Sequence, residues 1–175
     1  MPLFGSSRRP KLDGLTKDEE KRRDALNPEV MRRAGERGVE GQAPAAAALL
    51  QEKAEEEPRE CLWPLLLGWQ QMSLNRYSHA IEAFTGVVGR DGSEIRGYYG
   101  SGAAYFQAAE AKLNLGPAAT DEVVPLGMTV DNMYHEAARN FRRALELATE
   151  KSERDELQNA IGAVERALSR KAGRL

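Results

Sequence analysis

Hydrophobic residues recur three and four positions apart along most of this chain, the spacing that places side chains on one face of a helix. The clearest example lies near the C-terminus, where five apolar residues fall on one stripe: Leu157, Ala160, Ile161, Val164 and Leu168. Glycine and proline residues separate such stretches. The pattern predicts helices at roughly residues 27–38, 44–58, 62–74, 77–88, 94–113, 133–149 and 153–170. No stretch alternates like a strand, so we expect an all-α fold.

The N-terminal residues 1–26 show little of this periodicity. Residues 1–15 are rich in glycine, proline and serine, and we expect them to be disordered or loosely docked. Thr16 and Glu19 have the spacing of a capping box, which predicts a short polar helix behind this tail. At the other end of the chain, we expect residues 171–175 to fray.

The helix predicted at residues 62–74 is apolar on nearly every side, unlike the others. Its large apolar residues are Leu62, Leu65, Leu66, Leu67, Trp69 and Met72. A helix of this kind cannot present one polar face to water, so we expect other elements to cover it on both sides.

A helical signature occurs twice in the middle of the chain at a fixed distance. Gly68 and Gly102 are 34 residues apart. Each is a small residue in one helix, and each is followed by alanine and phenylalanine four positions apart in the next: Ala80 and Phe84, then Ala137 and Phe141. Aromatic residues accompany both copies, at Tyr77, Tyr98 and Tyr105. The spacing resembles that of the tetratricopeptide repeat (TPR) family.

The resemblance implies three antiparallel helix pairs stacked as a short α-solenoid, with a C-terminal capping helix, over residues 27–170. The first pair is degenerate, although stepping back 34 residues from Gly68 reaches Ala34, which is also small. Small residues at these positions let the second helix of a pair approach the first closely. A generic helical bundle is the alternative, because alanine-rich hairpins produce such spacing by chance.

The third pair departs from the family pattern by an insertion. Gly102 and Ala137 are 35 residues apart, which is 23 more than separate Gly68 and Ala80. Longer helices account for part of the difference, and residues 114–130 are expected to form a loop. Loops of this length are uncommon in compact domains and often functional, but a tolerated surface excursion is an equal alternative.

Composition and charge exclude several classes of function. The 25 basic and 27 acidic residues leave no strong overall field for nucleic acid or an anionic membrane. The single cysteine, Cys61, fits a reducing compartment and predicts a cytoplasmic protein. No stretch approaches the roughly 18 apolar residues of a membrane span, so we expect no membrane insertion. His79 and His135 lack partners at metal-ligand spacing, and we expect no metal, no cofactor and no enzymatic activity.

The resemblance places a binding surface on the concave face, which the first helix of each pair lines. Projected onto this sequence, the protein-binding residues are Leu62, Leu65, Trp69, Met72, Arg96, Tyr99, Phe106 and Gln107, with Met31 and Ala103 beside them. The lysine, asparagine and arginine residues that clamp acidic tails in some members are absent. A scaffold or adaptor that binds a hydrophobic peptide or an amphipathic helix of another protein is therefore expected.

Two alternatives to an open concave face remain. The face is covered from within, by the short N-terminal helix or the insertion, or it is buried in a homodimer. A nucleic-acid or membrane accessory is a weaker hypothesis, and it rests on basic residues at Arg8, Arg9, Lys11, Arg139, Arg142 and Arg143.

Overall fold

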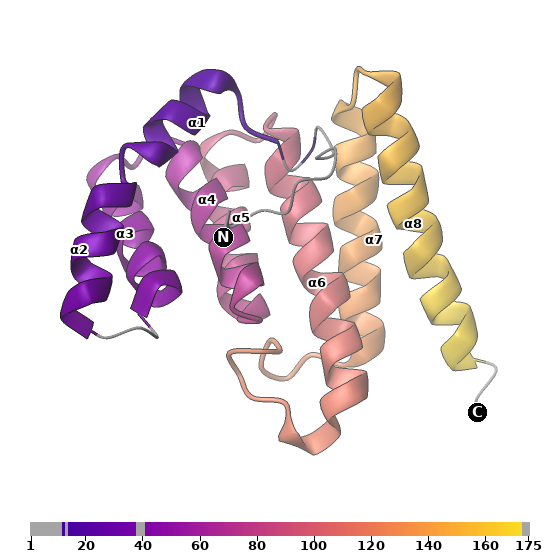
Figure 1. Cartoon of the computed structure of the whole chain (residues 1–175). Helices are drawn as coiled ribbons and strands as arrows, with labels where there is room; N and C mark the ends of the chain where they lie inside the picture. The colour runs from indigo at the N-terminus through magenta and orange to yellow at the C-terminus, as the bar shows by residue number, and fades with distance from the viewer. Residues whose placement is uncertain (1–11, 13, 38–40, 173–175) are drawn as a thin grey trace.

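The chain folds as a row of helices in which each packs mainly on the next. The computed structural model describes Leu12 and residues 14–37 and 41–172, and no strand occurs among them. Figure 1 shows the helices in chain order. They are α1 (Lys17–Asp24), α2 (Asn27–Arg37), α3 (Gln42–Glu56), α4 (Leu62–Ser73), α5 (Tyr77–Arg90), α6 (Ile95–Leu115), the short 3-10 helix η2 (Gly116–Ala118), α7 (Val130–Leu147) and α8 (Lys151–Ala172). The predicted all-α fold is confirmed.

Three antiparallel pairs make up the row: α2 with α3, α4 with α5, and α6 with α7. α8 packs on α7 at the end of the row, where the capping helix was expected. The arrangement has the character of a short helical solenoid, in which neighbours supply nearly all contacts. α1 precedes the first pair and lies across one end of the helices (Figure 1).

Most helix boundaries agree with the sequence pattern to within a few residues. The Thr16–Glu19 capping box is present in full, since each side chain accepts a hydrogen bond from the other's backbone N–H. Thr129 caps α7, because its side-chain oxygen accepts a hydrogen bond from the backbone N–H of Asn132. α8 continues to Ala172, so the helix extends two residues into the segment 171–175 that was expected to fray. The remainder of that segment, and the predicted helix end at 38–40, lie outside the described residues.

The repeated glycines are places where two helices meet without space for a side chain. A Cβ at Gly68 would lie 2.5 Å from the ring of Phe84. One at Gly102 would lie 2.7 Å from the ring of Phe141. These are equivalent contacts in two successive pairs, with the small residue on the first helix and the phenylalanine on the second. Gly100 adds a third such contact, because its Cβ would approach Phe84 to 2.4 Å from the following pair.

α4 is the central buried helix, as its apolar circumference predicts. Leu62, Trp63 and Leu67 face α3, whereas Leu65 belongs to a second cluster with Phe84 of α5. The second helices contribute fewer large residues, and α7 presents a single stripe of buried alanines with Phe141 and Tyr134. α4 is therefore the helix on which the first half of the array is built.

The insertion between α6 and α7 packs back on the array. Gly116, with φ of +55°, ends α6 in a conformation that favours glycine. The loop then reaches the start of α5, where the backbone N–H of Ser78 donates to the carbonyl of Glu122 at 3.2 Å. Val124 is buried in the same cluster as Met133. The loop is therefore docked on the α4–α5 turn.

Candidate protein-binding groove

The eight predicted binding residues do not form one open surface. We call the side of α4 and α6 that was predicted to carry these eight residues the inner face. Leu62 and Leu65 are fully buried in the core, with exposed fractions of 1% and 0%, so their assignment to an accessible face needs correction. Their helix, α4, is covered on both sides, and these two side chains pack against α3, α5 and residues near the N-terminus. Only Gln107 of the eight is exposed, and the remaining five residues are half-buried: Trp69, Met72, Arg96, Tyr99 and Phe106.

A row of aromatic rings connects the half-buried residues near the start of α6. Trp69 meets the edge of Phe84 with ring centroids 4.9 Å apart, and Tyr99 lies 6.2 Å from Trp69. Tyr99 also lies 5.8 Å from Phe141. Each ring contact of this kind adds about 1 kcal/mol to the burial of the rings. Trp69 and Tyr99 therefore join two helix pairs, α4–α5 and α6–α7, and this packing role accounts for their aromatic character without a binding partner.

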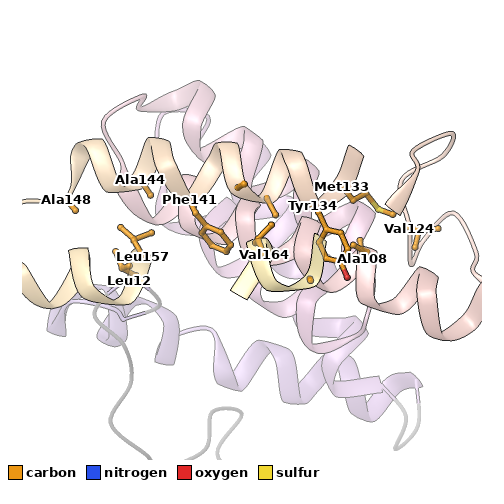
Figure 2. Close-up of a cluster of buried hydrophobic side chains, with 14 residues drawn as sticks. Leu12, Ala108, Val124, Met133, Tyr134, Phe141, Ala144, Ala148, Leu157 and Val164 are labelled. Carbon is orange, nitrogen blue, oxygen red and sulfur yellow. The ribbon is translucent and has the colours of Figure 1, made fainter. Parts of the chain in front are cut away.

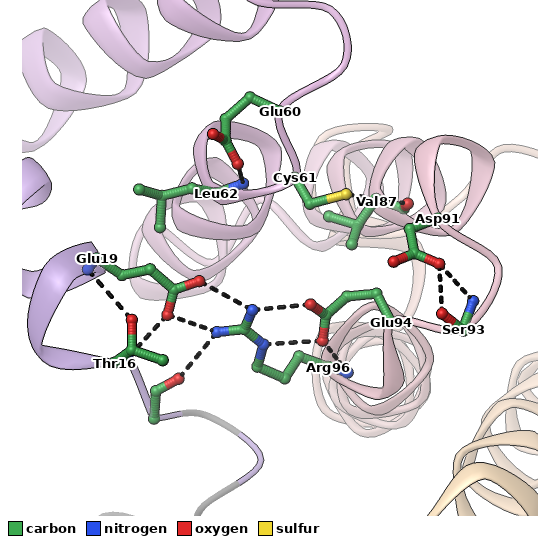
Figure 3. Close-up of polar contacts among 11 residues, drawn as sticks. Thr16, Glu19, Glu60, Cys61, Leu62, Val87, Asp91, Ser93, Glu94 and Arg96 are labelled. Atoms are coloured by element: carbon green, nitrogen blue, oxygen red, sulfur yellow. Dashed lines mark hydrogen bonds and ion pairs between the residues drawn. The ribbon is translucent and has the colours of Figure 1, made fainter.

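The N-terminal segment, by which we mean Leu12 and residues 14–24, closes this part of the inner face. Arg96 of α6 holds it by a bidentate pair to Glu19, with both N···O distances at 2.9 Å. The same guanidinium pairs with Glu94 at 2.8 Å and donates to the carbonyl of Gly14 at 3.4 Å. Figure 3 shows the guanidinium between the two carboxylates. Arg96, predicted to contact a partner, is thus engaged within the chain.

Electrostatics favour this closed arrangement near neutral pH. Burial raises the pKa of the Glu19 carboxyl, but hydrogen bonds from Arg96 and Thr16 lower it more, so its pKa lies below the ordinary value. The hydrogen bonds to Glu94 and Glu19 hold the pKa of the Arg96 guanidinium above its ordinary value, against the effect of burial. Both ions are therefore charged across the neutral range, which keeps the pair intact.

Two leucines attach the N-terminal segment to the array by burial. Leu12 has an exposed fraction of 1% and packs in the cluster that contains Leu157 and Ala148. Figure 2 shows Leu12 beside Leu157. Leu15 packs against both clusters of α4, and the Arg22 guanidinium lies 4.7 Å from the Trp63 ring centre. Of the two expectations for residues 1–15, disorder or loose docking, the contacts of Leu12 and Leu15 agree with docking, and residues 1–11 and 13 lie outside the described part.

The second half of α6 borders an open groove that the N-terminal segment does not line. The groove lies between α6 and α8, is open to solvent and has a volume of about 710 Å³. We call it the open groove, and its lining residues are Phe106, Gly162, Ala163, Glu165, Arg166, Ser169 and Arg170. Phe106 is one of the eight predicted residues, and Gln107 follows it on α6. Of the eight predicted binding residues, Phe106 is the one that lines this open groove.

The open groove has an apolar wall on α6 and a basic edge on α8. Phe106 is held by Tyr134, with ring centroids 5.8 Å apart. On α8, Glu165 pairs with Arg142 of α7 at 3.4 Å. Arg170 has its guanidinium 4.0 Å from Glu110, at the limit of an ion pair. Within the described part of the chain, no carboxylate pairs with Arg166. Positive charge is therefore less compensated than negative charge along this edge.

The sequence did not predict that α8 would line the groove, because binding residues were expected only on the first helix of each pair. Gly162 and Ala163 are two adjacent small residues beside the apolar stripe of α8, and they were the available signal. A Cβ at Gly162 would meet only the end of the Arg166 side chain, at 3.2 Å. This glycine therefore borders open space, unlike Gly68 and Gly102.

Reactive groups elsewhere give no catalytic arrangement among the residues described. Burial raises the pKa of the Cys61 thiol, and the carboxylates of Asp91 and Glu94 raise it further, so this cysteine stays protonated. His79 and His135 are both exposed. In the same part of the chain, no cluster of three or more histidine, cysteine or carboxylate side chains is placed to hold a metal ion.

The basic cluster on α7 is neutralised by neighbouring carboxylates. Arg139 pairs with Glu136 at 2.7 Å, Arg142 pairs with Glu165, and Arg143 pairs with Glu146 at 2.6 Å. Arg8, Arg9 and Lys11 lie outside the described residues. The side chains that were to support nucleic-acid binding by α7 are thus engaged within the protein.

None of the helices described combines the length and apolar character that crossing a membrane requires. The sequence matches no known family model and no curated protein.

Proposed function

We propose that this chain is a non-catalytic, TPR-like scaffold that binds a hydrophobic or amphipathic segment of another protein in the open groove. The observation that carries the proposal is the groove itself. It places a half-buried aromatic side chain, Phe106, opposite two small residues of α8 and leaves about 710 Å³ between them. Aromatic anchors in concave, partly apolar sites dominate the energetics of peptide recognition.

The repeated glycine–phenylalanine contacts support the TPR-like character. Gly68 with Phe84 and Gly102 with Phe141 are the same close approach in successive helix pairs. Stacked helix pairs of this type create an elongated inner surface that suits extended or helical ligands. A cytoplasmic location belongs to this proposal, because a single protonated cysteine fits a reducing compartment.

The test replaces Phe106 in the intact protein. A partner captured by the wild-type chain is purified, and its affinity is measured for wild type, Phe106→Glu and Leu113→Glu. Leu113 is on the same helix, is exposed, and does not line the groove. We expect Phe106→Glu to weaken binding by at least about tenfold, or about 1.4 kcal/mol, and Leu113→Glu to leave it unchanged. Equal affinity of the two variants would overturn the proposal.

Self-association is the second candidate function, and exposed leucines at the end of α6 favour it. Leu113 and Leu115 are about half exposed, and Leu126 of the insertion has an exposed fraction of 81%. Large exposed apolar side chains often mark contact surfaces. A dimer in sedimentation equilibrium that dissociates in Leu126→Glu and persists in Phe106→Glu would support this candidate. A wild-type monomer would exclude it.

A further inference from the structure

The edge of the open groove on α8 presents two arginines one helical turn apart. Arg166 and Arg170 are four residues apart, so their side chains project from the same face of α8. Glu165 directly precedes Arg166 in sequence, and its carboxylate pairs with Arg142 on α7. Arg170 is only marginally neutralised, by Glu110 at 4.0 Å, and Arg166 pairs with no carboxylate of the described residues. The edge therefore offers charge-assisted hydrogen bonds to an anionic ligand.

The shape of the groove suits a helix better than an isolated anion. Gly162, Ala163 and Ser169 are the small residues of α8 along its length, and small residues permit close approach of a second helix. The stretch from Gly162 to Arg170 rises roughly 12 Å, which matches a little more than two turns of a helix. Phe106 provides the apolar contact on the opposite wall.

We infer that the ligand of the open groove is an amphipathic helix of another protein, with an apolar stripe toward Phe106 and carboxylates along the edge that faces α8. This inference rests on the proposed function and specifies its partner. The two carboxylates would be one turn apart on the partner, opposite Arg166 and Arg170. Charge complementarity of this kind sets the orientation of a bound helix and speeds its association.

Charge also argues against the most obvious occupant from the same chain. Residues 1–11 carry Arg8, Arg9 and Lys11 and no acidic side chain. Bringing these cations to Arg166 and Arg170 would place like charges together, which costs free energy in a partly desolvated groove. The basic edge therefore selects for an acidic segment and against the N-terminal tail.

The test uses two alanine-based helical peptides with the same leucine stripe. One carries two glutamates a turn apart along its edge, and the other carries lysines at those positions. Binding to the full chain is measured by fluorescence anisotropy for wild type, Arg166→Glu and Arg139→Glu. Arg139→Glu is the matched control, because it makes the same charge change on α7, away from the lining of the groove.

We expect the wild type to bind the glutamate peptide about tenfold more tightly than the lysine peptide, with a preference that weakens as salt is added. Arg166→Glu should abolish or reverse the preference, whereas Arg139→Glu should keep it. Equal affinities for the two peptides, or a preference that survives Arg166→Glu, would overturn the inference.

Further measurements separate failure of this inference from failure of the proposed function. If both peptides bind equally and Phe106→Glu abolishes both, the groove binds apolar helices and only the acidic preference is wrong. If neither peptide binds in a Phe106-dependent manner, both are wrong. A single-stranded oligonucleotide that binds in an Arg166-dependent manner while neither peptide binds would show that the arginines recognise phosphate, which also overturns the inference.

Discussion

The two halves of the inner face have similar apolar sequences, but one half is covered by another part of the chain and the other half is open. Around Trp69 and Tyr99, the N-terminal segment closes the surface with an ion pair and two leucines. We refer to this part as the closed half. Around Phe106, no part of the N-terminal segment lines the surface, and the groove stays open toward α8. The difference shows that apolar character alone does not identify a binding site, because a chain can supply its own cover.

The two glycines that border these halves should differ most in their response to substitution. Gly102→Leu should destabilise the protein by about 3 kcal/mol or more, since its side chain would overlap Phe141 inside the closed packing. Gly162→Leu should change stability little or raise it slightly, because it borders the open groove and leucine favours the helix. Urea unfolding of both variants measures this. Equal losses would mean that the groove at Gly162 is closed.

Leu12 should matter to stability as a core residue, despite its place in a polar tail. Leu12→Ala should cost about 2 kcal/mol, because it removes a buried side chain from the cluster around Leu157. Leu113→Ala, at an exposed position of α6, is the matched control and should cost less than about 0.5 kcal/mol. Thermal unfolding of the two variants compares them. A Leu12→Ala variant as stable as wild type would show that the closed half is not closed by this segment.

The ion pairs of the closed half should contribute unequally. Arg96→Met should cost about 2 kcal/mol, because it leaves Glu19 and Glu94 half-buried without their shared cation. Glu19→Gln should cost about 1 kcal/mol, since Arg96 keeps Glu94. The free energies of unfolding in urea give both values. The reverse order, with Glu19→Gln the more damaging, would contradict the shared-cation arrangement.

The smallest expected effect is a dependence of the closed half on pH. The folded-state pKa of Glu19 lies below its ordinary value of about 4.3, so the pair contributes fully above that value. The contribution is lost as the pH falls through the folded-state pKa, because protonation removes the charge that Arg96 binds. Unfolding free energies from pH 7 downward should fall less steeply in Glu19→Gln than in wild type. Parallel curves would contradict the assignment.

The sequence predicted the repeated helix pairs because their causes are local or periodic. The close approach at Gly68 and Gly102 and the capping box at Thr16 and Glu19 follow from residue size and short spacing. Which part of the inner face is covered does not follow from such local rules. Arg96 and Glu19 are 77 residues apart, and neither position shows in isolation that the other will reach it. Periodicity identifies an apolar face but not the segment that covers it.

The open groove was only half visible in the sequence for a similar reason. Phe106 and Gln107 were projected onto the inner face by their register in α6. The opposite wall comes from α8, whose pattern predicts which residues pack on α7 but not which remain beside α6. Gly162 and Arg166 can be recognised as groove-lining residues only when α6, α7 and α8 are seen side by side, as in Figure 1.

Hydrogen–deuterium exchange of the full chain, with and without the glutamate peptide, tests the division of the inner face most directly. We expect the peptide to slow exchange over residues 162–170 and around Phe106 and to leave exchange over residues 14–24 unchanged. Altered exchange over residues 14–24 with no change at 162–170 would contradict it, because the peptide would then bind the closed half by displacing the N-terminal segment.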